Sequence, residues 1–171
     1  MENKRFWQGI IILGLVFGMV LLSCNKGASR LDAALNGTWI GIDNNGVSIE
    51  IKFQNGNFES STKSIDTGDV EAKGTYITES GKIIMNTTQS RMIGGEVAQE
   101  LGIESRWYSN EELILIFKPI FEIYGMSDEE INILVNLTVS PPAGAYSVDG
   151  DILTITTTIQ GHSSTVTLRK Q

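Results

Sequence analysis

Residues 47–53 alternate strictly between apolar and polar side chains, and this alternation constrains the fold more than any other feature of the chain. A β-strand points successive side chains to opposite faces, so Val47, Ile49, Ile51 and Phe53 are expected to share one face. Asn-Gly pairs stand before and after the stretch, and these residues tolerate the positive φ of tight hairpin turns. The pattern therefore predicts a half-buried antiparallel strand between two hairpins.

Similar patterns recur along the chain. Residues 74–84 and 144–153 resemble each other, since each contains a strand, a glycine turn and a second strand. Eight strands are predicted, at about 37–43, 47–53, 57–62, 72–78, 82–88, 143–148, 151–158 and 163–170. Regular spacing with turns favours a meander that closes on itself, because closure leaves no unpaired sheet edge. The predicted fold is mainly β, an eight-stranded antiparallel up-and-down barrel.

Residues 89–142 break the strand pattern and form an insert between the fifth and sixth predicted strands. Two serine–glutamate pairs in the insert, Ser109 with Glu112 and Ser127 with Glu130, have the spacing of a capping box and precede apolar runs. In a capping box the serine accepts a hydrogen bond from the third helical N–H and the glutamate reaches back to the serine N–H. The insert is therefore expected to contain two short helices.

The first of these helices is predicted over about 110–118, where Pro119 ends or kinks it unless it continues to Tyr124. The second is predicted over about 128–136. A weaker helical turn is expected within residues 92–101.

The amino terminus has a short basic region followed by an apolar run over residues 10–22. A membrane-spanning helix needs about 20 apolar residues, so this shorter run favours an export signal over a permanent anchor. The next residues, Leu-Leu-Ser-Cys, resemble a bacterial lipobox. The resemblance implies cleavage between Ser23 and Cys24 and a diacylglycerol on Cys24, together with an acyl group such as palmitate on its amino group. We expect a lipoprotein signal peptide over 1–23.

Lipid chains on Cys24 would attach the protein to a membrane, because two or three acyl chains hold a protein stably where one does not. Residues 24–34 are small and polar and are expected to form a tether, followed by the barrel domain over 35–171. Asn25 stands where many Gram-negative lipoproteins carry the Asp that retains them in the inner membrane. The expected location is therefore the outer membrane or the cell surface.

The chain also resembles the lipocalin-like domains of the calycin group. The resemblance covers residues 35–88 and 143–171 and consists of a G-x-W pattern ending at Trp39, the eight-strand count and a basic end to the last strand. In that group a basic side chain from the last strand packs over the first-strand tryptophan. The resemblance therefore implies that Trp39 pairs with Arg169 or Lys170 to close the barrel, and strand parity does not choose between them.

The charge and residue counts exclude several classes of function. The formal net charge is −7, whereas a protein that neutralises phosphates needs a basic face, so no nucleic-acid partner is expected. One Cys and one His cannot form a disulfide or a Cys/His metal cluster. His162 is expected in a solvated turn, and Asp149 and Asp151 fit a hairpin turn that lacks the other oxygen ligands of a calcium site. No metal or cofactor is expected, and the absence of any complete catalytic motif predicts a protein that is not an enzyme.

Two hypotheses for the function follow from this prediction. In the first, the barrel binds an apolar small molecule, since eight strands enclose just enough space for one. The candidate lining residues are Trp39 at the floor, Ile49, Ile51, Phe53, Tyr76 and Tyr146. The same side chains could instead fill the interior.

In the second hypothesis, the protein is a surface interaction or structural lipoprotein whose barrel is filled by side chains and holds no ligand. The helical insert, with Phe117, Phe121 and Tyr124, would then contact a protein partner or cover one end of the barrel.

Overall fold

The computed structural model describes residues 31–42, 46–63, 68–95, 98–99, 102–123, 127, 143–159 and 162–171. Its elements are a 3-10 helix η1 (Ala33–Leu35), the helix α3 (Asn110–Ile123) and the strands β1 (Gly37–Ile42), β2 (Ser48–Gln54), β3 (Asn57–Lys63), β4 (Asp69–Glu79), β5 (Lys82–Ile93), β6 (Tyr108–Ser109), β7 (Gly144–Asp149), β8 (Ile152–Ile159) and β9 (His162–Lys170). Within these residues no helix combines the length and apolar character needed to cross a bilayer.

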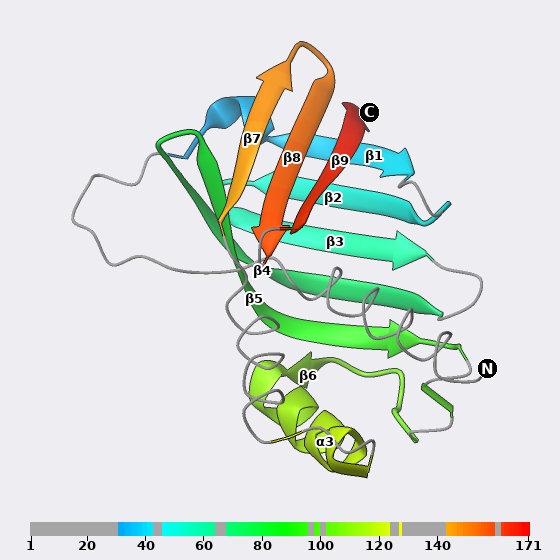
Figure 1. The fold of residues 1–171 in the computed structure, drawn as a ribbon. Coiled ribbons are helices and arrows are strands. Elements are labelled where there is room, and N and C mark those ends of the chain that lie inside the picture. The colour runs from blue at the N-terminus through cyan, green and yellow to red at the C-terminus, as the bar shows by residue number, and fades with distance from the viewer. Residues whose placement is uncertain are drawn as a thin grey trace.

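Eight of the strands form a closed antiparallel up-and-down barrel (Figure 1). Each strand from β1 to β5 pairs with the next, β5 pairs with β7, and β9 returns to pair with β1. The two-residue strand β6 pairs with β5 outside this ring. The mainly β class and the barrel predicted from the sequence are thus confirmed, and the architecture is compatible with a lipocalin-like fold.

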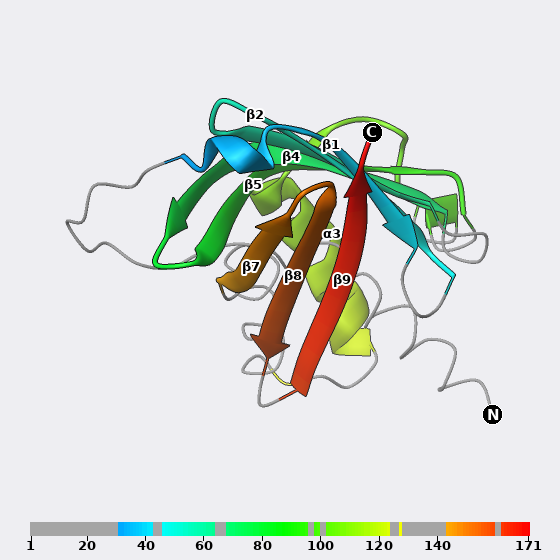
Figure 2. The same ribbon diagram turned by 90° about the horizontal axis from the view of Figure 1, so that it is seen from above.

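The barrel closes through two short seams. At one seam β1 and β9 pair through two residues each, and at the other β5 and β7 do the same. Beyond the seams the five-stranded sheet β1–β5 and the three-stranded sheet β7–β9 separate, so the two sheets meet at one end and diverge toward the other (Figure 2). Gly41 lies just past the first seam, where an added Cβ would come within 2.7 Å of the Leu168 side chain. Glycine at this position lets the two sheets cross closely.

Strand β5 is longer than predicted, and residues 89–93 belong to it instead of the insert. Thr88 is an extra residue opposite the step from Lys73 to Gly74, so the two strands form a bulge there. Beyond the bulge Ala72 lies opposite Ser90 and Val70 opposite Met92. The prediction of a helical turn within residues 92–101 was therefore wrong for residues 92 and 93, which belong to β5. Residues 98–99 are helical.

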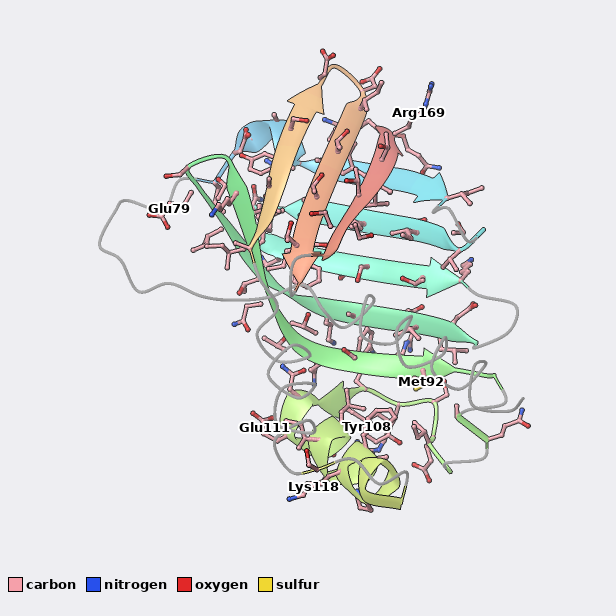
Figure 3. All side chains as sticks on the ribbon, viewed as in Figure 1. Glu79, Met92, Tyr108, Glu111, Lys118 and Arg169 are labelled. Atoms are coloured by element: carbon pink, nitrogen blue, oxygen red, sulfur yellow. The ribbon has the colours of Figure 1, made fainter. Side chains whose placement is uncertain are left out.

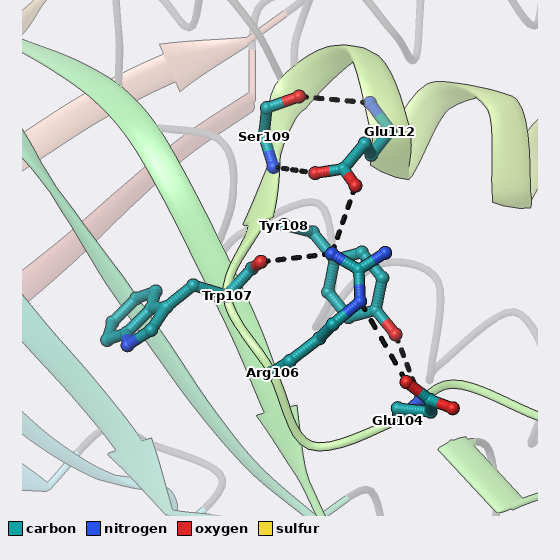
Figure 4. A network of polar contacts seen from close by, with 6 residues as sticks. All are labelled: Glu104, Arg106, Trp107, Tyr108, Ser109 and Glu112. Carbon is teal, nitrogen blue, oxygen red and sulfur yellow. Dashed lines mark hydrogen bonds and ion pairs between the residues drawn. The ribbon is translucent and has the colours of Figure 1, made fainter.

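Helix α3 begins with the capping box predicted from the sequence (Figure 4). The Glu112 N–H donates to Ser109 Oγ at 3.2 Å, and the Ser109 N–H donates to Glu112 Oε2 at 2.8 Å. The bond from the Ser109 N–H to the Glu112 carboxylate, together with one from Arg106, lowers the pKa of Glu112. The helix continues past Pro119 to Ile123. The second predicted helix, 128–136, lies outside the described residues.

Two apolar clusters fill the concave side of the β1–β5 sheet. The first, which we call the barrel cluster, lies between β1–β5 and β7–β9; its buried residues are Leu35, Trp39, Ile51, Phe53, Phe58, Tyr76, Ile83, Met85, Leu153, Ile155 and Leu168. The second, the helix cluster, lies between α3 and the ends of β4 and β5, and its buried residues are Val70, Met92, Ala98, Ile103, Tyr108 and Leu113 (Figure 3). The described elements and both clusters lie within residues 31–171.

Candidate functional site

The end of the barrel where the sheets meet is closed by the chain that leads into β1. Leu35 ends η1 and is fully buried in the barrel cluster. The Trp39 Nε1–H donates to the Leu35 carbonyl oxygen at 2.6 Å, and Asp32 caps η1 by accepting from the Ala34 N–H at 2.9 Å. Residues 31–34, which were predicted to belong to the tether, therefore lie against the barrel, and we call them the plug of this end.

Two tyrosines hold the plug in place. The Tyr146 hydroxyl donates to Asp32 Oδ2 at 2.8 Å, and the Tyr76 hydroxyl lies 3.5 Å from Asn36 Oδ1. Burial raises the pKa of both tyrosines, and the Asp32 carboxylate adds to the effect. Both hydroxyls therefore stay protonated at neutral pH and act as donors.

Lys170 lies over Trp39 at the seam between β1 and β9. Its Nζ is 5.1 Å from the indole centroid, a distance at which a cation is attracted to the ring. Arg169, the other basic residue considered from the sequence, is exposed and points away from the barrel (Figure 3). Of the two candidates, Lys170 is the one that contacts the tryptophan.

Replacing Lys170 with methionine should lower the free energy of unfolding by about 0.5–2 kcal/mol, because the aliphatic stem is kept and the charge over the ring is lost. The matched change Arg169→Met removes an exposed charge and should stay within about 0.5 kcal/mol of the parent protein. Urea unfolding followed by circular dichroism measures both. Equal losses in the two variants would show that the contact with Trp39 contributes nothing.

Toward the diverging end, inward-facing residues are incompletely buried. Alternation along the paired strands directs five of them toward the interior: Ile49, Ser60, Thr157, Ser164 and Val166. Ile49 and Val166 pack against the barrel cluster and are only partly buried, and Ser164 is exposed. We call these five residues the mouth. Their side chains are small or aliphatic and carry no charge.

A band of small buried side chains lies beside the mouth on the β1–β5 sheet. Thr62, Ala72, Thr87 and Ser90 occupy inward positions between the barrel cluster and the helix cluster. Ser60 of the mouth lies opposite Ala72, and Ala72 lies opposite Ser90, so the mouth and the buried band are adjacent on the inner face of the sheet. The Ser90 side chain is 0% exposed, and among the described residues its Oγ is the buried polar side-chain atom without a hydrogen-bond partner.

The six candidate lining residues divide between the two ends. Four of them are buried in the barrel cluster near the closed end: Trp39, Ile51, Phe53 and Tyr76. Ile49 and Tyr146 are partly buried at its margin, Ile49 in the mouth and Tyr146 under the plug. The incompletely buried inward positions of the mouth are therefore mainly serine, threonine and valine residues that sequence reasoning did not select.

The other candidate positions are placed as follows. Cys24 and the predicted signal peptide lie outside the described residues. His162 is the first residue of β9 and pairs with Ile159. Asp149 and Asp151 flank Gly150, whose positive φ of 57° belongs to the tight β7–β8 turn. Among the described residues no three His, Cys, Asp or Glu side chains are grouped closely enough to hold a metal ion.

Sequence reasoning did not identify Asp32 as a plug residue, and it named Lys170 as one of two candidate partners of Trp39. Alternation puts Val166, Leu168 and Lys170 on one face of β9, and the burial of Leu168 in the structure identifies that face as the inward one. Asp32 gave no such signal, since its contact with Tyr146 joins residues far apart in the sequence.

Comparison with known proteins finds no matching family model, no matching curated protein and no matching solved structure.

Proposed function

We propose that the protein is a lipid-anchored lipoprotein of the bacterial cell envelope whose barrel binds an apolar small molecule. The observation that carries this proposal is the pair of diverging sheets, with partly buried, uncharged inner side chains at the end where they separate. A ligand pocket is typically apolar with a few polar groups that fix orientation. The mouth and the adjoining band supply the polar hydroxyl groups, and the barrel and helix clusters beside them supply the apolar surface.

Binding without chemical conversion is the function we propose for this site. The described inner face presents hydroxyl and aliphatic groups, and a general acid–base or nucleophilic mechanism requires a nucleophile, a base and an orienting group in contact. The proposed ligand would be released in the same chemical form in which it binds.

The membrane anchor is proposed from the sequence alone. The apolar run 10–22 followed by the lipobox-like residues supports processing before Cys24 and lipid attachment to its sulfur. Radiolabelled fatty acid should be incorporated into the full-length protein and lost in Cys24→Ala. Incorporation that survives this change would overturn the anchor proposal and leave the binding proposal standing.

A soluble fragment of residues 25–171 tests binding with the apolar fluorescent probe diphenylhexatriene. We expect saturable probe fluorescence, weakened by Val166→Phe, which fills the mouth from β9. The control Thr165→Phe places the same ring one residue away, on the exposed outer face of β9. Absence of saturable binding would favour the alternative of a filled barrel that acts through its surface. If Val166→Phe and Thr165→Phe weakened probe binding equally, the probe would bind outside the mouth.

A further inference from the structure

We infer that the barrel selects an uncharged amphiphile, an apolar chain with one neutral hydrogen-bonding group such as a long-chain alcohol, and that the Ser90 hydroxyl binds that group. This inference rests on the proposed binding function and adds the chemical class of the ligand. It excludes fatty-acid carboxylates and phosphate-bearing lipids as preferred ligands.

The first observation is the absence of charge on the inner surface. Among lysine, arginine, aspartate and glutamate residues, Lys170 is the one at an inward position of the described strands, and it lies over Trp39 at the closed end. The polar groups near the diverging end are the hydroxyls of the mouth and the band. An ionised group buried without a charged partner loses its hydration at a large cost. A carboxylate placed here would have no lysine or arginine beside it at the described inward positions.

The second observation is the Ser90 hydroxyl itself. Buried polar atoms in proteins almost always have a hydrogen-bond partner, so an exception requires an explanation. Ser90 shares the inward face of β5 with Met92, and Ala72 on the neighbouring strand lies directly opposite it. Ala72 in turn lies opposite Ser60, which is only partly buried. A ligand that enters through the mouth therefore needs to pass two strands along a surface of small side chains to reach Ser90 Oγ.

The flanking clusters determine what the rest of the ligand must be. The barrel cluster lies on one side of Ser90 and the helix cluster on the other, and both consist of apolar and aromatic side chains. A hydroxyl, ether or carbonyl oxygen can accept from the serine hydroxyl without bringing a charge into this environment. The remaining ligand surface must be apolar to fit between the clusters.

The test compares dodecanol with dodecanoate as competitors of diphenylhexatriene on the 25–171 fragment, at a pH where the carboxyl is ionised. Dodecanol should bind at least about tenfold more tightly than dodecanoate, because only the acid must bury a charge. Ser90→Ala should weaken dodecanol binding about two- to tenfold, as expected for one lost hydrogen bond. Binding of the probe, which has no polar group, should not change.

Ser61→Ala provides a matched control, because Ser61 is the neighbour of Ser60 and points to the outer face of β3. Ser61→Ala should leave the binding of both dodecanol and dodecanoate unchanged. Dodecanoate binding as tight as dodecanol, or a Ser90→Ala effect that is absent or equal for dodecanol and the probe, would overturn this inference and leave the binding barrel intact. Failure of the probe and both competitors to bind would instead overturn the proposed function.

Discussion

Replacing Trp39 with alanine should lower the free energy of unfolding by about 3–5 kcal/mol, the range for removing a buried aromatic side chain. Trp39 is fully buried in the barrel cluster and lies in the seam that joins β1 to β9. Its Nε1–H bond to Leu35 also ties the plug to the first strand. The loss therefore combines a cavity, a broken hydrogen bond and a weakened seam. Urea unfolding followed by far-ultraviolet circular dichroism measures it.

Trp107 offers the matched control for this substitution. Its ring lies against two outward-facing cations, with Lys73 Nζ 4.2 Å and Arg91 Cζ 4.8 Å from the centroid, and it is only partly buried. Trp107→Ala should cost no more than about 2 kcal/mol, since exposed cation–π contacts contribute about 0.5–1 kcal/mol each. A loss in Trp107→Ala that equals the loss in Trp39→Ala would contradict the central place given to the β1–β9 seam.

Gly74→Ala should destabilise the barrel by about 3 kcal/mol or more, at the upper end for steric overpacking. An added Cβ would lie 2.7 Å from the Asn86 carbonyl carbon and 2.9 Å from Thr87 Cα, and closer still to the Asn86 carbonyl oxygen. These are backbone atoms of a paired strand, so no side-chain rotation can relieve the clash. The β4–β5 pairing must open at the bulge, and thermal unfolding should begin at a markedly lower temperature.

Gly81→Ala separates this steric effect from the general cost of losing a glycine. Gly81 has a positive φ of 73° in the β4–β5 turn, and nothing lies within 4 Å of an added Cβ. The expected cost is about 1–2 kcal/mol, from the left-handed backbone alone. If Gly74→Ala lowered the free energy of unfolding by less than Gly81→Ala, this result would contradict the close approach of β4 and β5 at the bulge.

Local patterns were enough to predict the eight strands of the barrel and their order along the chain, although not the short strand β6. The alternation in residues 47–53 and the Asn55-Gly56 turn, in which both residues have positive φ, identify β2 and its hairpin to β3 directly. The capping box at Ser109 likewise predicted where α3 begins. These features depend on residues close in sequence, so a single sequence carries them.

The end of β5 and the mouth could not be predicted in the same way. The bulge at Thr88 changes the phase of the inward positions, and Ser90 is small and polar, so residues 89–93 show no clear apolar alternation. The mouth depends on how far the two sheets diverge beyond their seams, which is set by contacts between strands distant in sequence. Aromatic residues were the natural candidates for a binding surface, yet most of them pack at the closed end.

The measurement that tests the central claim most directly is native mass spectrometry of residues 25–171, purified without denaturant, followed by organic extraction. This fragment lacks Cys24 and so carries no covalent lipid. A discrete additional mass that is released on unfolding, and that proves to be an apolar molecule, is the result predicted for a ligand-binding barrel. A mass equal to the polypeptide alone, with no saturable binding of apolar probes, would contradict the claim and indicate a filled barrel.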